Sequence, residues 1–305
     1  MFDLIFILKQ YNKFLYCFLF LLVVNSLYAQ SDIDYNQDRV DVLKQKYLEN
    51  KESRNVRYIL FQIIQDETDP DEKLYYSNLL VGLTDPIPNN DIFNKDSTLF
   101  YRSTAFLQKG NALQLLGELH EAVDAYFVGI ELAKKDSDED FAAGLLVSVA
   151  DTYSMMGNSE SAEKYYDEAL LLLRKGNDSI ALASALLNAG DEYLNTKQYN
   201  KALKYFEESG EIFDIKNSQI GKAYNMGNIG MVYAQQGSHE LAKSNINDAI
   251  AILIEMEDFY PISVYLNAMS EIYVEQQDYV EAIDYAYRSL DLAKDYNLKD
   301  QLSEA

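Results

Sequence analysis

LLNAGDEYLNTKQYNKALKYFEES (186–209) and MGNIGMVYAQQGSHELAKSNINDA (226–249) carry one pattern twice, forty residues apart. In each copy a small residue and an aromatic residue precede a polar break, and an alanine follows it, Ala202 or Ala242. Apolar and small residues recur at i, i+4 and i+7 on both sides of the break, which is the spacing of an amphipathic helix. Each copy therefore predicts two helices that face each other across a turn.

The alanine after the break marks the same pattern along most of the chain. It recurs every forty residues, at Ala122, Ala162, Ala202, Ala242 and Ala282. Twelve residues before each alanine stands a small residue, at Gly110, Ala150, Gly190, Gly230 and Ser270. Small side chains allow two helix backbones to approach closely. A fixed period of this length is typical of stacked helix-turn-helix units, so we predict an all-α solenoid with five units over residues 101–302.

This pattern resembles the tetratricopeptide repeat family over about two thirds of the chain. The family has small residues at its eighth, twentieth and twenty-seventh positions and an aromatic residue at its eleventh, as both quoted stretches have. The period of forty exceeds the family's usual 34 residues. Long-period arrays of this kind are similar to the N-terminal sensory regions of bacterial membrane signalling proteins. The resemblance implies a module that binds a protein or peptide.

The N-terminus differs in character from the repeats. Lys9 and Lys13 precede an apolar run from Phe14 to Val24, and Ala29 precedes a polar residue. These features predict a secretory signal peptide over residues 1–29. An uncleaved anchor is the alternative, although the run is shorter than the ~20 residues of a comfortable membrane span. We therefore expect an exported protein of the bacterial periplasm or cell envelope, tethered to the membrane if the segment is retained.

Residues 30–100 have helix-like spacing that is out of register with the repeats. Three helices are predicted here, over Asp32–Asn50, Ser53–Asp66 and Pro70–Leu83. Asp69 is placed to cap the third helix and Pro70 to occupy its first turn. A loop is predicted at 85–90. The simplest role for this region is a helical cap that covers the first repeat.

At the C-terminus, Ser303 aligns with the first residue of the earlier units. Residues 303–305 are therefore predicted to begin a truncated sixth repeat, and we expect the natural protein to continue into an effector. The fifth unit would leave an apolar face near Ile283, Tyr287 and Leu290 without a following helix. Self-association through that face is the prediction that follows.

Composition argues against several classes of function. The net charge of −23 disfavours a nucleic-acid-binding surface and adsorption to anionic membranes. The two histidines, His120 and His239, fall in the turns of units that are not adjacent, and the only cysteine, Cys17, lies in the predicted signal peptide. Neither a catalytic triad nor a zinc site is predicted from these residues. We expect no metal, no cofactor and no enzymatic activity.

The resemblance implies that the first helix of each unit lines the ligand-binding face. The residues placed there are Asn111, Gln114, Asp151, Met155, Asn188, Asp191, Asn228, Met231, Glu271 and Glu275. The set contains no lysine or arginine, so the carboxylate clamp of some chaperone-binding relatives is missing. The amides of Asn188 and Asn228 could bind an extended peptide backbone, or could simply be solvated. The acidic members favour a basic or neutral peptide over an acidic one.

These observations predict a protein- or peptide-binding module, the exported sensory region of a bacterial signalling protein. Its effector, a histidine kinase, a nucleotide cyclase or a DNA-binding regulator, would lie outside this chain. A free-standing periplasmic scaffold for envelope complexes is the alternative. A cytoplasmic peptide-sensing regulator is a further one, and it would retain residues 1–29.

Overall fold

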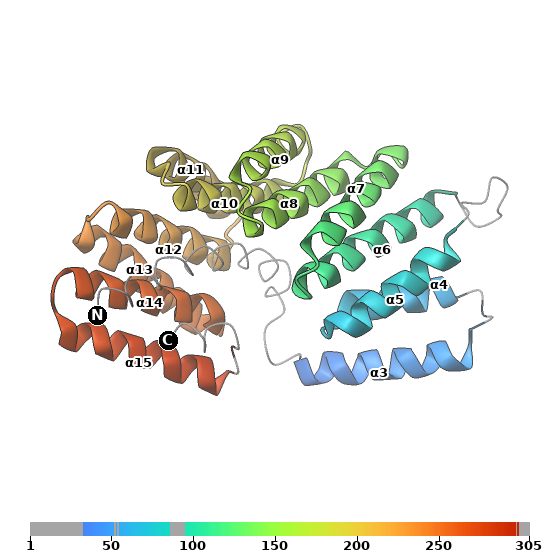
Figure 1. Cartoon of the computed structure of the whole chain (residues 1–305), viewed down its shortest axis with the longest axis horizontal. Helices are drawn as coiled ribbons and strands as arrows, with labels where there is room; N and C mark the ends of the chain where they lie inside the picture. Colours follow the sequence, from blue (N-terminus) through green and yellow to red (C-terminus); the bar gives the residue numbers. More distant parts are fainter. Residues whose placement is uncertain (1–32, 52, 54, 86–94, 297, 299–305) are drawn as a thin grey trace. The chain divides into compact units, whose positions relative to one another are not determined.

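The computed structural model describes residues 33–51, 53, 55–85, 95–296 and 298, and these ranges contain helices and no strand (Figure 1). The predicted all-α class is thereby confirmed. The predicted signal segment 1–29, most of the predicted loop at 85–90 and the predicted start of a sixth repeat at 303–305 lie outside the described residues.

Thirteen helices occupy the described ranges, three before the repeats and then five pairs. The first three are α3 (Ile33–Glu49), α4 (Val56–Asp66) and α5 (Pro70–Leu83). The pairs are α6 (Lys95–Leu115) with α7 (Leu119–Lys135), α8 (Glu139–Met155) with α9 (Ser159–Leu173), α10 (Ser179–Asn195) with α11 (Tyr199–Ile215), α12 (Gln219–Gln235) with α13 (His239–Glu255), and α14 (Phe259–Glu275) with α15 (Tyr279–Asp295). The second helices begin at residues 119, 159, 199, 239 and 279, at intervals of forty. The helices form two compact units, one with α3 to α9 and the other with α10 to α15.

One residue with positive φ closes the first helix of every pair. Three of these residues are the glycines predicted in the breaks, and Lys197 and Gln277 take the same conformation in the other two pairs, with φ of 61° and 63°. The following N–H then donates to a carbonyl five residues earlier, as from Ser238 to Tyr233 at 2.9 Å. This geometry satisfies carbonyl groups that the helix end leaves free and reverses the chain. The predicted turns are therefore confirmed.

The helices of a pair meet where the small residue faces the repeated alanine. Ser270 Oγ donates to the carbonyl of Ala282 at 2.8 Å. A Cβ atom added to Gly230 would lie 3.1 Å from the carbonyl oxygen of Ala242. All five alanines of the series are buried. The predicted close approach of the two helix backbones is confirmed by these contacts.

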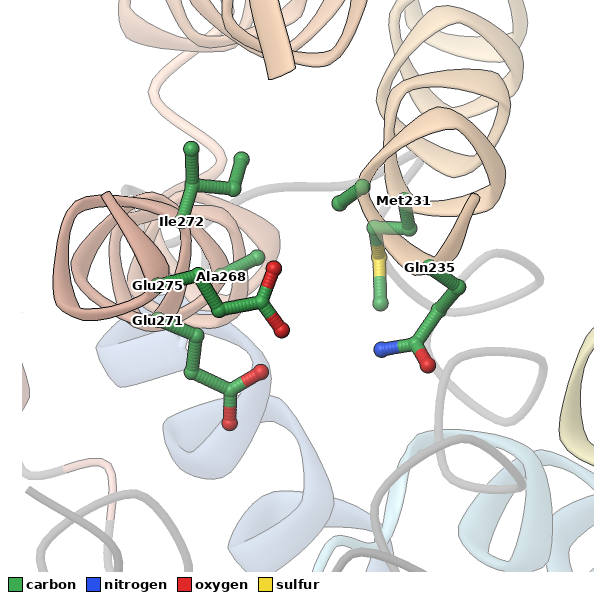
Figure 2. A pocket seen from close by; sticks show the side chains of 7 residues that line it. Met231, Gln235, Ala268, Glu271, Ile272 and Glu275 are labelled. Carbon is green, nitrogen blue, oxygen red and sulfur yellow. The ribbon is translucent and has the colours of Figure 1, made fainter. Parts of the chain in front are cut away.

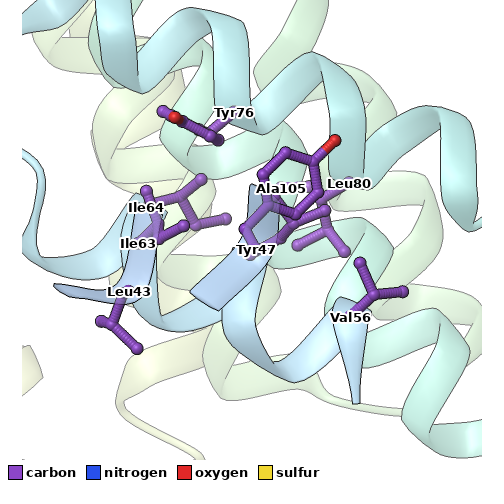
Figure 3. Close-up of a cluster of buried hydrophobic side chains, with 9 residues drawn as sticks. Leu43, Tyr47, Val56, Ile63, Ile64, Tyr76, Leu80 and Ala105 are labelled. Carbon is purple, nitrogen blue, oxygen red and sulfur yellow. The ribbon is translucent and has the colours of Figure 1, made fainter. Parts of the chain in front are cut away.

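The region before the repeats packs on their first helix. Helices α4 and α5 both contact α6. Figure 3 shows the buried cluster that contains Tyr47, Ile63 and Leu80 together with Ala105 of α6. The Asp69 side chain accepts a hydrogen bond from the N–H of Glu72 at 2.9 Å, which is the predicted cap of α5. Helix α4 begins three residues later than predicted, because Ser53 and Asn55 are in a turn in which Asn55 N–H donates to Ser53 Oγ.

Helix α15 exposes an apolar stripe along one side. Ile283 and Tyr287 are 56% and 61% exposed, and Val280 is exposed beside them. These three residues are spaced i, i+3 and i+7, so they share a helix face. The corresponding residues of α13 are polar, at Glu240, Lys243 and Asn247. Self-association through this face of α15 stays a prediction.

Replacing Ala202 by leucine should destabilise the protein by about 1–3 kcal/mol, because the larger side chain must enter a fully packed helix contact. The quantity to measure is the free energy of unfolding in urea, with Lys204→Leu as the control. Lys204 is exposed on the same helix, so this control should change stability by less than about 0.5 kcal/mol. Equal stability of Ala202→Leu and the parent protein would contradict the assigned contact.

Candidate peptide-binding face

The first helices of the unit containing α10 to α15 lie next to one another, with α10 against α12 and α12 against α14. A small groove lies between α12 and α14, with a cavity volume of about 20 Å³ (Figure 2). We call this the α12/α14 groove. Its lining residues are Met231, Ala234 and Gln235 from α12, and Ala268, Glu271, Ile272 and Glu275 from α14. On each helix they are three or four residues apart and so form a single stripe.

The α12/α14 groove combines an apolar floor with a polar rim. Met231 and Ile272 are only 4% and 2% exposed, so their side chains form the base. The small side chains of Ala234 and Ala268 leave the space between the helices open. Figure 2 shows the carboxylates of Glu271 and Glu275 extending from α14 toward the gap that separates them from α12. An occupant would therefore meet an apolar surface and negative charge together.

His239 lies at the edge of this arrangement. It is the first residue of α13, and its Nε2 atom is 3.8 Å from a carboxylate oxygen of Glu275. The neighbouring cation, Lys243, pairs instead with Glu240 at 2.6 Å, outside the residues that line the groove. The sequence placed His239 in a turn, and the structure places it at the start of α13, partly buried beside a carboxylate of the groove.

A buried hydrogen-bonded chain links the three first helices one turn away from the groove. Asn228 Nδ2 donates to Asp191 Oδ1 at 2.7 Å, and Tyr265 OH donates to Asn228 Oδ1 at 3.0 Å. The Tyr265 hydroxyl also lies 3.1 Å from the carbonyl oxygen of Tyr224. We call Asp191, Asn228 and Tyr265 the polar ladder. Asn228 is 1% exposed, and its side-chain oxygen and one of its amide hydrogens form hydrogen bonds within the protein. It therefore holds the first helices together beneath their exposed face.

In the unit containing α3 to α9, tyrosines of the second helices engage the predicted site residues. Tyr126 OH donates to Asn111 Oδ1 at 2.8 Å, and Tyr166 OH donates to Asp151 Oδ1. Burial, with a smaller contribution from Asp151, raises the pKa of Tyr126 well above its usual value, so the hydroxyl stays protonated and can donate. Gln114 is also buried and donates to Thr152 Oγ1 at 3.0 Å. These side chains hold helices together within the protein.

The structure thus divides the ten predicted site residues among several environments. Met231, Glu271 and Glu275 come together in the α12/α14 groove. Asp191 and Asn228 come together in the polar ladder, while Asn188 is buried and Met155 is partly exposed on other parts of the first-helix face. Asn111, Gln114 and Asp151 take part in the hydrogen bonds of the other unit.

Sequence reasoning missed Tyr265 in the polar ladder and four residues of the groove, Ala234, Gln235, Ala268 and Ile272. The four groove residues lie three or four positions from a predicted site residue on the same helix, so helical spacing could have found them. Within the described residues, no group of three or more potential ligands is arranged to hold a metal ion. None of the described helices combines the length and the apolar character that a membrane span requires.

Removing the Asn228 side chain should destabilise the protein, because Asp191 and Tyr265 each lose a buried hydrogen-bond partner. We expect Asn228→Ala to lower the free energy of unfolding by about 1–3 kcal/mol. A double-mutant cycle with Tyr265→Phe isolates the Asn228–Tyr265 interaction, for which we expect a coupling of about 1 kcal/mol. Strict additivity of the two substitutions would argue against this hydrogen bond.

A sequence model described as "Tetratricopeptide repeat" matches residues 141–214 and 219–295, whereas no curated protein sequence matches the chain. The apo form of RapI is similar in structure, with a TM-score of 0.69 and 14% sequence identity over 96% of this chain and 100% of that one. A Rap protein complexed with competence and sporulation factor has a TM-score of 0.67 and 16% identity, over 90% of this chain and 77% of that one. BtubC from P. vanneervenii has a TM-score of 0.62 and 16% identity, over 76% of this chain and 93% of that one.

At these identities the structural neighbours show the fold alone, and their fold agrees with the sequence match. Both matched segments consist of the helix pairs described above, with their small-residue contacts and closing turns. The chain belongs to the tetratricopeptide repeat family and contains a repeat module for protein–protein interaction.

Proposed function

We propose that this chain is the exported ligand-binding region of a bacterial signalling protein, and that it binds an extended peptide or protein segment on its first-helix face. The observation that carries this proposal is the α12/α14 groove. It lies between the first helices of two successive repeats, and it brings together three side chains that the sequence assigned to a ligand.

The chemistry of the groove supports a peptide as the occupant. Ala234 and Ala268 supply apolar surface to the groove above the buried side chains of Met231 and Ile272. Glu271, Glu275 and Gln235 supply hydrogen-bond acceptors above this floor. Because the lining residues that the structure describes include two carboxylates and no lysine or arginine, a basic or neutral peptide is favoured over an acidic one. The Rap protein complexed with competence and sporulation factor adds that a protein of similar fold binds another factor.

The sequence supports the proposed export and the proposed role in signalling. Residues 1–29 have the charge and apolar pattern of a signal peptide. The long-period array resembles the sensory regions of bacterial membrane signalling proteins, in which an effector follows the repeats. A free-standing scaffold of the periplasm would share the signal peptide and the groove but would need no effector, so the size of the natural protein separates the two functions.

The size of the protein in its own cells is therefore the first quantity to measure, by immunoblot with an antibody raised against the repeats. We expect a band well above 34.9 kDa, because an effector would follow the repeat array. A band slightly below this mass, with its N-terminus after Ala29, would overturn the effector and identify a processed scaffold. A protein that retains residues 1–29 and fractionates with the cytoplasm would overturn the export.

Peptide binding can be tested by selecting from a displayed library of random twelve-residue peptides on the full chain. We expect selected peptides to lose at least tenfold in affinity for Ala268→Phe, since the larger side chain fills the α12/α14 groove. Ala251→Phe is the matched control, because Ala251 is exposed on α13 and does not line the groove. Selected peptides that bind both variants equally well would place the peptide site elsewhere.

A further inference from the structure

We propose that the apolar stripe of α15, formed by Val280, Ile283 and Tyr287, binds the same stripe of a second copy of this chain in an antiparallel pair of helices. This inference goes beyond the proposed function, because it concerns a second helix that contributes no residue to the α12/α14 groove. A dimer of this kind would carry two such grooves.

The preceding repeats show which side chains a following repeat covers. Shifted by forty residues, Val280 corresponds to Glu160, Asn200 and Glu240, and Tyr287 corresponds to Asp167, Glu207 and Asn247. All six side chains are polar and exposed, although another helix pair or first helix follows each of them. In the first pair, His120 is likewise exposed, while Phe127 packs against Tyr165 of α9. A further repeat after α15 would therefore leave Val280 in solvent, and Tyr287 as well if it followed the pattern of α9, α11 and α13.

The stripe is thus apolar at positions where the other second helices meet water. Val280 is 78% exposed, and Ile283 and Tyr287 are each more than half exposed. Single exposed apolar residues are common on protein surfaces, but these three lie on one helix face, one turn apart. A continuous apolar patch of this kind is typical of an interaction surface.

The order of the side chains along α15 makes the stripe complementary to itself. In an antiparallel pair, Ile283 of one copy can face Tyr287 of the other. The same register places Val280 opposite Leu290, which is partly exposed at the end of the stripe. A two-fold axis makes each of these contacts occur twice, so one short stripe supplies four apolar contacts.

One flank of the stripe carries both signs of charge in the order that this pairing needs. Asp284 and Arg288 are one helical turn apart, 3.9 Å from each other, and their side chains are 63% and 51% exposed. When two copies pair antiparallel, equal flanks meet. In the register above, Asp284 of one copy and Arg288 of the other are offset by about two residues, or ~3 Å along the helix axis. An arginine side chain can span this offset, so two ion pairs can form between the copies.

These ion pairs explain how a strongly acidic chain could bind itself. The net charge of −23 repels two copies at long range. At the stripe, however, each carboxylate of the Asp284 type would meet a guanidinium group, which favours this orientation over a parallel one. A single 17-residue helix covers less area than the ~800 Å² per partner of a typical stable interface. We therefore expect a weak dimer that forms as the protein concentration rises.

The first test is sedimentation equilibrium of the full chain over a wide range of concentrations. We expect the average mass to rise toward twice that of the monomer. Val280→Asn with Tyr287→Asn should weaken this association at least tenfold. Asparagine occupies the corresponding positions at Asn200 and Asn247, so the helix should tolerate both substitutions without a change in charge.

The matched control removes two exposed apolar side chains from another second helix. Leu241 and Ile254 of α13 are 53% and 56% exposed and lie outside the stripe. Leu241→Asn with Ile254→Asn should leave the association of the chain unchanged. An equal loss of association in the two double variants would overturn the stripe and indicate general adhesion of apolar surface.

The second test uses the charges to check the antiparallel register. Asp284→Arg places like charges opposite Arg288 of the second copy, and Arg288→Asp does the same opposite Asp284. Each variant alone should therefore associate less than the parent chain. An equal mixture of the two should associate more than either one alone, because every contact at this flank then joins opposite charges. A mixture that associates no better than its components would overturn the proposed register.

The outcomes are independent of those for peptide binding. A parent chain that stays monomeric at every concentration would overturn the second copy as the occupant of the stripe and assign the stripe to a different partner. Peptide selection by such a monomer would leave the proposed function intact. A dimer that Val280→Asn with Tyr287→Asn abolishes, in a chain that selects no peptide, would support this inference and contradict the peptide site.

Discussion

The contact between the small residue of each first helix and the alanine of its partner is the constraint on which the repeats depend. At Gly230 a single added carbon would come within 3.1 Å of the carbonyl of Ala242, and at Ser270 the hydroxyl bonds to the carbonyl of Ala282. Two backbones this close can cross in few ways, because interiors are packed to the density of crystals. Helices α10 to α15 are accordingly all 17 residues long and join through turns of the same geometry.

One pair of positions, the first on the first helix and the second on its partner helix, carries different side chains from repeat to repeat. The residue of the first helix and its partner on the second are Asn111 and Tyr126, Asp151 and Tyr166, Asp191 and Phe206, Met231 and Ile246, and Glu271 and Ala286. Where the partner is tyrosine, its hydroxyl engages the polar side chain of the first helix. Where it is phenylalanine, Asp191 instead accepts a hydrogen bond from Asn228 of the next repeat. In the last two pairs the partners are Ile246 and Ala286, whose side chains have no polar atom, and the first-helix residues Met231 and Glu271 line the groove.

The sequence predicted the fold well because its signals are local. Helical spacing, the break residues and the small-residue positions all lie within one pair, and each pair repeats them. Contacts between repeats were harder to predict because they do not follow the period. Hydrogen bonds between neighbouring first helices join residues that are almost one helical turn out of register. The steps from Asp191 to Asn228 and from Asn228 to Tyr265 are therefore 37 residues rather than forty. An alignment at forty instead matched Asn188 with Asn228, and it gave no reason to choose Tyr265. The groove was partly predicted, because Met231, Glu271 and Glu275 share the first-helix face, but its floor depends on side chains that only packing brings together.

The negative charge of the chain and the α12/α14 groove act on a ligand in different ways. A net charge of −23 attracts any cation over long distances and is weakened by salt within about 10 Å at 0.1 M. Such a field raises the rate of encounter but cannot distinguish one basic peptide from another. Discrimination requires contacts whose energy depends on shape, and in the proposed function the residues that line the groove would provide them. Attraction would therefore belong to the whole acidic surface and selection to seven residues of two helices, so changes in the groove should alter which peptide binds more than how fast peptides arrive.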